Sequence, residues 1–71
     1  MNELILKYVQ CEVAPMDAEL VCVTNISPCF MDHEQHYSVT YYNRLGDVRD
    51  SHVTLISMSD LLGFMYNGEG Q

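Results

Sequence analysis

The segment HYSVTYYN, residues 36–43, gives the clearest indication of secondary structure in the chain. Tyr37, Val39 and Tyr41 recur at every second position, a period that is typical of a β-strand with one face on a hydrophobic core. The side chains between them, which would point to the opposite face, are Ser38, Thr40 and Tyr42. We therefore expect a strand here, with the rest of the fold arranged around it.

The residues after this strand predict a turn and a second strand. Gly46-Asp47 is a pair that favours a tight turn. SHVTLIS, residues 51–57, then alternates again, which predicts a strand that returns antiparallel to the first. Its two expected faces carry Val53 and Leu55 on one side and His52, Thr54 and Ile56 on the other.

The N-terminal segment NELILKYVQCEV, residues 2–13, is compatible with two kinds of secondary structure. Its apolar side chains Leu4, Ile5, Tyr8 and Val9 would fit one face of a helix. The run through Val13 would also serve as a strand that changes face at a bulge. Of these two, we favour the strand.

The region between this segment and the central strand predicts a turn, a strand and a long loop. Pro15 and Asp17 indicate the turn. ELVCVTNI, residues 19–26, is apolar and β-branched and predicts a buried strand. SPCFMDHEQ, residues 27–35, then forms the longest segment without periodicity, so we expect an irregular loop there.

The C-terminal region carries the best helix signal. Ser57 and Asp60 have the spacing of a capping box, and Asn67-Gly68 supplies a stop. Between them Met58, Leu61, Leu62 and Met65 form an apolar stripe that would lie on a sheet. The fold class expected is α+β: a single domain, residues 1–71, with an antiparallel sheet of three to four strands and one C-terminal helix on a face. The last residues, 69–71, are expected to fray.

The charge of the chain limits its partners. Its net charge is −7, with ten acidic residues against only three basic ones, which are Lys7, Arg44 and Arg49. Binding to nucleic acid or to an anionic membrane surface requires several cationic contacts, so we expect neither. An acidic surface suits a basic protein partner.

The cysteines and the hydropathy pattern bear on the compartment. The chain shows no signal peptide, and no stretch approaches the roughly 20 apolar residues of a membrane span. Cys11, Cys22 and Cys29 are odd in number, which favours free thiols over a disulfide framework. These features predict a cytoplasmic protein.

The segment CFMDHEQHY, residues 29–37, raises the question of a metal site. Cys29, His33 and His36 have the spacing C-x3-H-x2-H, and Cys22 or Asp32 could supply a fourth zinc ligand. The paired knuckles of known zinc modules are absent, and a solvated loop has the same composition. We expect no cofactor, with a zinc-binding domain as an alternative.

Enzymatic activity is not expected. The chain has no nucleophile elbow, phosphate-binding loop or dinucleotide fingerprint, and no zinc-protease motif. Ser57 and Ser59 are explained by a helix cap, and a domain of 71 residues has little room for a substrate pocket.

The candidate partner-binding residues surround the predicted hairpin. Tyr42 lies on the face opposite Tyr37 and Tyr41, which we assign to the core, so it is the aromatic side chain most suited to contact a partner. The acidic residues expected around it are Asp32, Glu34, Asp47 and Asp50. An acidic rim beside an exposed aromatic ring is a binding surface in which charge steers and the ring anchors; the alternative is an ordinary solvated hairpin.

These observations favour a small non-enzymatic module that binds a basic surface of a larger protein. Phage and mobile-element inhibitors, including anti-CRISPR and anti-restriction proteins, are often of this size and charge, and some occupy nucleic-acid-binding surfaces. That likeness is one of kind and involves no shared residues. The two alternatives are the zinc-binding domain and a structural homo-oligomer, for example a homodimer that buries a sheet edge or a helix face.

Overall fold

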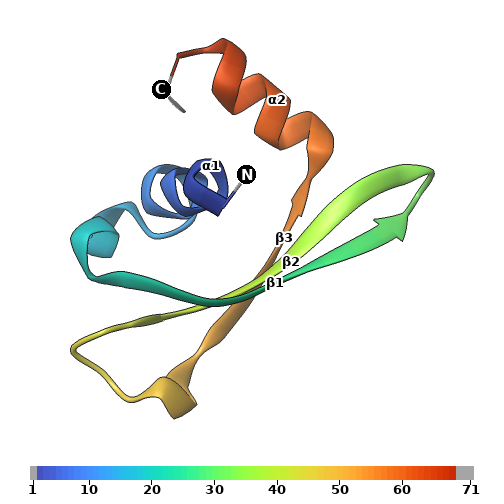
Figure 1. Ribbon diagram of the computed structural model, residues 1–71. Coiled ribbons are helices and arrows are strands. Elements are labelled where there is room, and N and C mark those ends of the chain that lie inside the picture. The colour runs from blue at the N-terminus through green and yellow to red at the C-terminus, as the bar shows by residue number, and fades with distance from the viewer. Residues whose placement is uncertain (1, 69–71) are drawn as a thin grey trace.

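A computed structural model describes residues 2–68 of the chain (Figure 1). The expected fraying of residues 69–71 therefore concerns residues outside the described range. The order of elements is α1 (Asn2–Tyr8), a π-helical turn (Val9–Val13), a 3₁₀ segment (Pro15–Leu20), β1 (Val21–Met31), β2 (Glu34–Asn43), a 3₁₀ turn (Val48–Asp50), β3 (His52–Ser57) and α2 (Met58–Tyr66).

The three strands form one antiparallel sheet in the order β1-β2-β3, and α2 packs on it. The predicted α+β fold is thus confirmed. The predicted pairing of the central strand with residues 51–57 is also confirmed, because Tyr37 lies opposite Ile56 and Tyr41 lies opposite His52. Ile56 is buried while Val53 and Leu55 are exposed, so the face of β3 with Ile56 is the one on the core.

The prediction of an irregular loop over residues 27–35 is wrong. β1 runs to Met31 and β2 begins at Glu34, so only Asp32 and His33 form the turn between them. Both have positive φ, 53° and 62°, which is the backbone of a type I′ hairpin turn. The lack of periodicity in residues 27–35 concealed this strand, and Pro28 is tolerated because β1 is an edge strand.

The preferred strand over residues 2–13 is also wrong, because this segment is helical. Ile5 and Val9, four residues apart, are both fully buried. Leu4 and Tyr8 pack against the same core cluster. A helix places all four side chains on one face, whereas a strand would put Leu4 and Tyr8 on the face opposite Ile5 and Val9. The helical alternative was therefore the correct one.

The helix α2 begins as predicted but buries a different face. The Ser57 hydroxyl accepts a hydrogen bond from the Asp60 backbone N–H at 3.1 Å, and Gly68 after the helix has a φ of 78°. Leu61 and Phe64 are buried, whereas Leu62 and Met65 of the expected stripe are exposed. The reason is that α2 also contacts α1: the rings of Tyr8 and Phe64 meet edge to face with centroids 5.4 Å apart.

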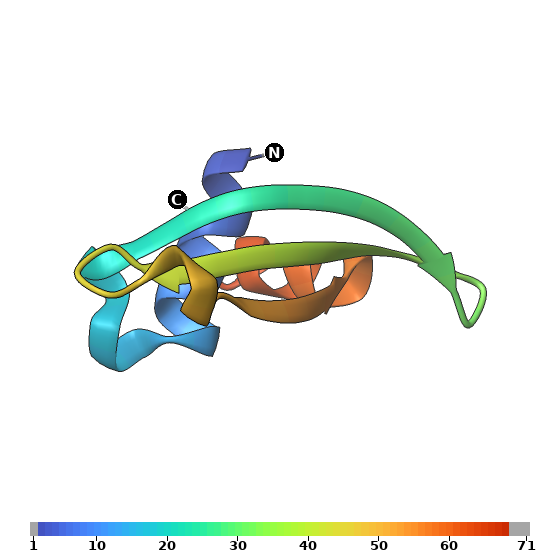
Figure 2. The same cartoon turned by 90° about the horizontal axis from the view of Figure 1, so that it is seen from below.

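Both helices cover the same face of the sheet. One buried cluster joins Ile5 and Val9, Val39 of β2, Ile56 of β3 and Leu61 of α2. The opposite face, which we call the helix-free face, has no helix over it within residues 2–68 (Figure 2). Figures 1 and 2 also show the turn between β1 and β2 projecting past the helices. Within the described residues, no helix is both long and apolar enough to cross a membrane.

Two neighbouring leucines of α2 test this packing. Leu61→Ala should lower the free energy of unfolding by about 2–5 kcal/mol, because it leaves a cavity in the core. Leu62→Ala should lower it by less than about 1 kcal/mol, since Leu62 is 40% exposed and Leu61 only 1%. Denaturant unfolding followed by circular dichroism measures both. Equal losses would contradict the observed orientation of α2.

A glycine substitution tests the hairpin turn. His33→Gly should raise the free energy of unfolding by up to about 1 kcal/mol, because glycine adopts a positive φ without the strain that a side chain brings. The matched change Gln35→Gly, one position into β2, should instead lower it by about 0.5–1 kcal/mol. Thermal unfolding of the two variants shows whether each one is stabilised or destabilised. A stabilising Gln35→Gly would contradict the placement of the turn.

Candidate functional site

The five predicted partner-binding residues lie at two ends of the sheet. Asp32 and Glu34 are at the β1–β2 turn, whereas Asp47 and Asp50 are in the loop between β2 and β3. The ten residues of β2 separate these ends, a length of about 30 Å at 3.4 Å per residue. The structure therefore does not bring the predicted acidic residues together into one rim.

Tyr42 belongs to the end that carries Asp47 and Asp50. It lies opposite Cys22 on β1, one residue before β2 ends. The neighbouring Cys22 side chain raises the pKa of Tyr42, first by hydrogen bonding to its hydroxyl and then by the negative charge of the thiolate, and burial adds to the shift. Tyr42 is half-buried, so part of its ring is free for contact with another molecule.

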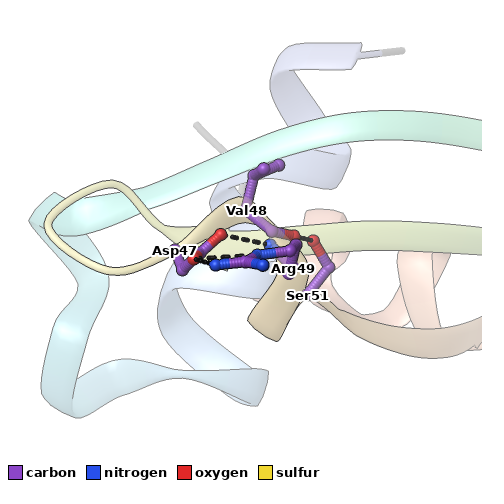
Figure 3. A network of polar contacts seen from close by, with 4 residues as sticks. All are labelled: Asp47, Val48, Arg49 and Ser51. Carbon is purple, nitrogen blue, oxygen red and sulfur yellow. Dashed lines mark hydrogen bonds and ion pairs between the residues drawn. The ribbon is translucent and has the colours of Figure 1, made fainter.

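The loop after β2 is organised by Asp47. The Asp47 carboxylate accepts hydrogen bonds from the Arg49 backbone N–H at 2.9 Å and from the guanidinium Nε and Nη2 at 3.0 and 2.7 Å. Figure 3 shows these contacts and the bond from the Ser51 hydroxyl to the Val48 carbonyl. The Arg49 guanidinium also lowers the pKa of Asp47. Asp47 therefore holds the loop, and Arg49 neutralises much of its charge.

A hollow of about 650 Å³ opens beside this loop. Its second wall is the corner where the π-helical turn meets the 3₁₀ segment, and Figures 1 and 2 both place that corner at the loop end of the sheet. Most of its lining is apolar or aromatic, and we call this part its floor: Val13, Pro15, Met16, Val21, Tyr41, Tyr42, Leu45 and His52. The lining also includes three exposed carboxylates, which we call its rim: Asp17, Asp47 and Asp50. We call this site the acidic hollow.

Two rings support the floor of the acidic hollow. Tyr41 and His52 are neighbours across β2 and β3, with ring centroids 5.6 Å apart. Met16 and Leu45, which also line the hollow, are 93% and 78% exposed. The hollow thus offers an apolar surface next to carboxylates, which suits a side chain that is apolar along its stem and positive at its end.

Sequence reasoning found three residues of this site and missed the others. Tyr42, Asp47 and Asp50 were predicted because they lie near one turn in the sequence. Asp17 was taken only as a turn residue, and Met16 and Leu45 were not singled out. A prediction of Asp17 would have needed the helix over residues 2–13, since that helix carries the chain to this end of the sheet.

Comparison with known protein families, with curated proteins and with solved structures finds no match to this chain.

The predicted zinc ligands are only partly brought together. Cys29 and His36 lie directly opposite one another on β1 and β2, whereas His33 is in the turn. Cys22 pairs with Tyr42, near the far end of β2. Within residues 2–68, no three side chains of His, Cys, Asp or Glu form a group that could hold a metal ion.

Glu34 contacts the start of α2. Its carboxylate Oε1 accepts hydrogen bonds from the Ser59 backbone N–H, at 2.8 Å, and from the Ser59 hydroxyl. These bonds, with a smaller contribution from the nearby His36, lower the pKa of Glu34. A carboxylate is favourable at a helix N-terminus, where backbone N–H groups lack partners. Glu34 thus joins the β1–β2 hairpin to α2, a structural role that the sequence did not indicate.

The pH dependence of unfolding tests this contact. Because the pKa of Glu34 is lower in the folded chain, its contribution to the free energy of unfolding is present above the unfolded-chain value of about 4.3 and is lost as the pH falls through the folded-chain value. Wild type should therefore be more stable than Glu34→Gln at pH 7, and this difference should shrink as the pH falls below the unfolded-chain value and through the lower folded-chain value.

Denaturant unfolding at a series of pH values measures this difference. The control is Asp32→Asn, which removes a neighbouring charge that forms no hydrogen bond with α2 within residues 2–68 and keeps a residue that tolerates positive φ. It should retain the pH dependence of the wild type. A difference between wild type and Glu34→Gln that stayed constant with pH would contradict the charged contact.

Proposed function

We propose that the chain is a non-enzymatic protein-binding module whose acidic hollow receives a basic segment of a larger protein. The observation that supports this proposal is the arrangement of three carboxylates around an apolar floor, with exposed apolar side chains at the opening. Such a surface combines steering by charge with anchoring by apolar contact.

The charges at the rim are suited to a cation. Within residues 2–68, neither Asp17 nor Asp50 forms an ion pair, and the one ion pair at the hollow joins Asp47 to Arg49. The net charge of −7 adds a long-range attraction for a basic partner and repels phosphate groups. Direct contact with nucleic acid is therefore disfavoured at this site.

The apolar part of the hollow gives the interaction its anchor. A lysine or arginine side chain can lay its methylene stem on apolar surface while its charged end meets a carboxylate. Met16 and Leu45 can extend this contact to an apolar neighbour in the partner, because both line the hollow and are largely exposed. A partner segment of mixed basic and apolar side chains fits these features best.

Basic surfaces of this kind are found on proteins that bind nucleic acid. The target that we propose is therefore a nucleic-acid-binding surface of a larger protein, which the module would block as phage and mobile-element inhibitors do. We further propose that it acts in the cytoplasm, where thiols stay reduced. In support, Cys11, Cys22 and Cys29 are all free.

Nuclear magnetic resonance with model peptides tests the site before any partner is known. A short peptide of alternating lysine and leucine should shift the backbone amide signals of the loop after β2 and of the corner around Met16. A peptide of alternating glutamate and leucine should not. The shifts should weaken with salt, because the screening length falls from about 10 Å at 0.1 M to about 3 Å at 1 M.

Charge reversal identifies the carboxylates that bind the basic peptide. Asp17→Lys and Asp50→Lys, each made alone, should reduce peptide affinity about tenfold, whereas Glu3→Lys, a single reversal of the same size on exposed α1 surface outside the hollow, should alter it less than twofold. Asp47 is left unchanged because it holds the loop. Equal losses from the hollow variants and from Glu3→Lys, or peptide shifts confined to the β1–β2 turn, would reject the acidic hollow as the binding site.

A further inference from the structure

The pair formed by Cys29 and His36 lies outside the acidic hollow, near the opposite end of the sheet. We propose that these two residues are half of a zinc site, and that the same two residues of a second copy of the chain complete it. The site would then be a tetrahedral Cys₂His₂ centre on the two-fold axis of a homodimer.

The register of the sheet places both ligands together. Cys29 and His36 are direct partners in the β1–β2 pairing, so their side chains leave the sheet on the same face. That face is opposite the core, because Tyr37, the next residue of β2, packs against the core on the other side. Ser57, the β3 partner of His36, and Glu34 share this face and bond the first turn of α2, so the pair lies beside the start of that helix. Both residues are half-buried, which leaves them accessible from outside.

The orientation of the His36 ring is that of a metal ligand. Its Nδ1 lies 3.0 Å from the backbone carbonyl of Glu34, which can only accept a hydrogen bond, so Nδ1 carries the proton. In the neutral ring with this tautomer, Nε2 has the lone pair that a metal ion would bind. Ligating histidines usually donate their other ring N–H to a carbonyl or carboxylate in this way.

The number of ligands requires a second chain. Structural zinc takes four protein ligands, and no third side chain of the required type joins this pair within residues 2–68. His33 is held in the turn with a φ of 62° and is not part of the paired strands. Two copies related by a two-fold axis each supply one thiolate and one imidazole, which completes the coordination.

The surroundings of the pair allow a second copy to approach. Ser27 and Ser38, two positions along the same face, are small and face one another. On β3, Val53 and Leu55 are exposed on this face and would be covered in the dimer. Without metal, two chains that each carry a net charge of −7 repel one another, so dimerisation should depend on zinc.

Zinc titration of the metal-free chain under reducing conditions tests this site. Native mass spectrometry and sedimentation should show a monomer without metal and a dimer containing one zinc ion per two chains when zinc is added. Cobalt in place of zinc should give a thiolate-to-metal charge-transfer band. A chelator should return the chain to the monomer.

Four variants assign the ligands. Cys29→Ser and His36→Gln should each abolish the zinc-dependent dimer, and both should keep the circular dichroism spectrum of the metal-free wild type. Cys11→Ser removes an exposed thiol elsewhere, and His33→Gly removes the histidine of the turn; both should still form the dimer. These controls separate the proposed pair from nonspecific thiol or imidazole binding.

Three results would overturn the proposal: zinc bound one per chain without dimerisation, a zinc dimer that survives both Cys29→Ser and His36→Gln, or no zinc binding at equimolar metal. The peptide experiment on the acidic hollow is independent of all three, because the hollow lies at the other end of β2.

Discussion

Val39 lies near the middle of β2 and is fully buried in one cluster with Ile5, Val9, Ile56 and Leu61. This packing sets the form of the molecule, because a short chain has enough apolar side chains for one layer of core but not for two. Both helices are consequently drawn to the same face of the sheet. The other face carries the Cys29–His36 pair and the half-buried ring of Tyr42.

Local patterns predicted those elements whose structure is decided locally. The alternation in residues 36–43 and 51–57 identified β2 and β3, because one face of each meets the core. Ser57 at the start of α2 was identified because its hydroxyl bonds to a backbone N–H three residues along. Each of these elements is determined either by the one face that it turns to the core or by a hydrogen bond to a residue nearby in the sequence.

The elements that were wrongly predicted depend on contacts between distant segments. Residues 2–13 are helical because Ile5 and Val9 must reach a core made by β2, β3 and α2. Residues 27–31 form a strand because β2 offers them hydrogen-bonding partners. Phe64 is buried because Tyr8 lies beside it. The acidic hollow has the same origin, since Asp17 joins Asp47 and Asp50 only through the path of the N-terminal helix.

The contact between Tyr8 and Phe64 also has a consequence for the order of folding. The β1–β2 and β2–β3 pairings join neighbours in the sequence, so they close short loops at low entropic cost. The two aromatic rings come from elements near opposite ends of the chain, and bringing them together closes a loop that contains most of the molecule. The sheet is therefore expected to assemble first, and the docking of the terminal helices on one another to complete the native state.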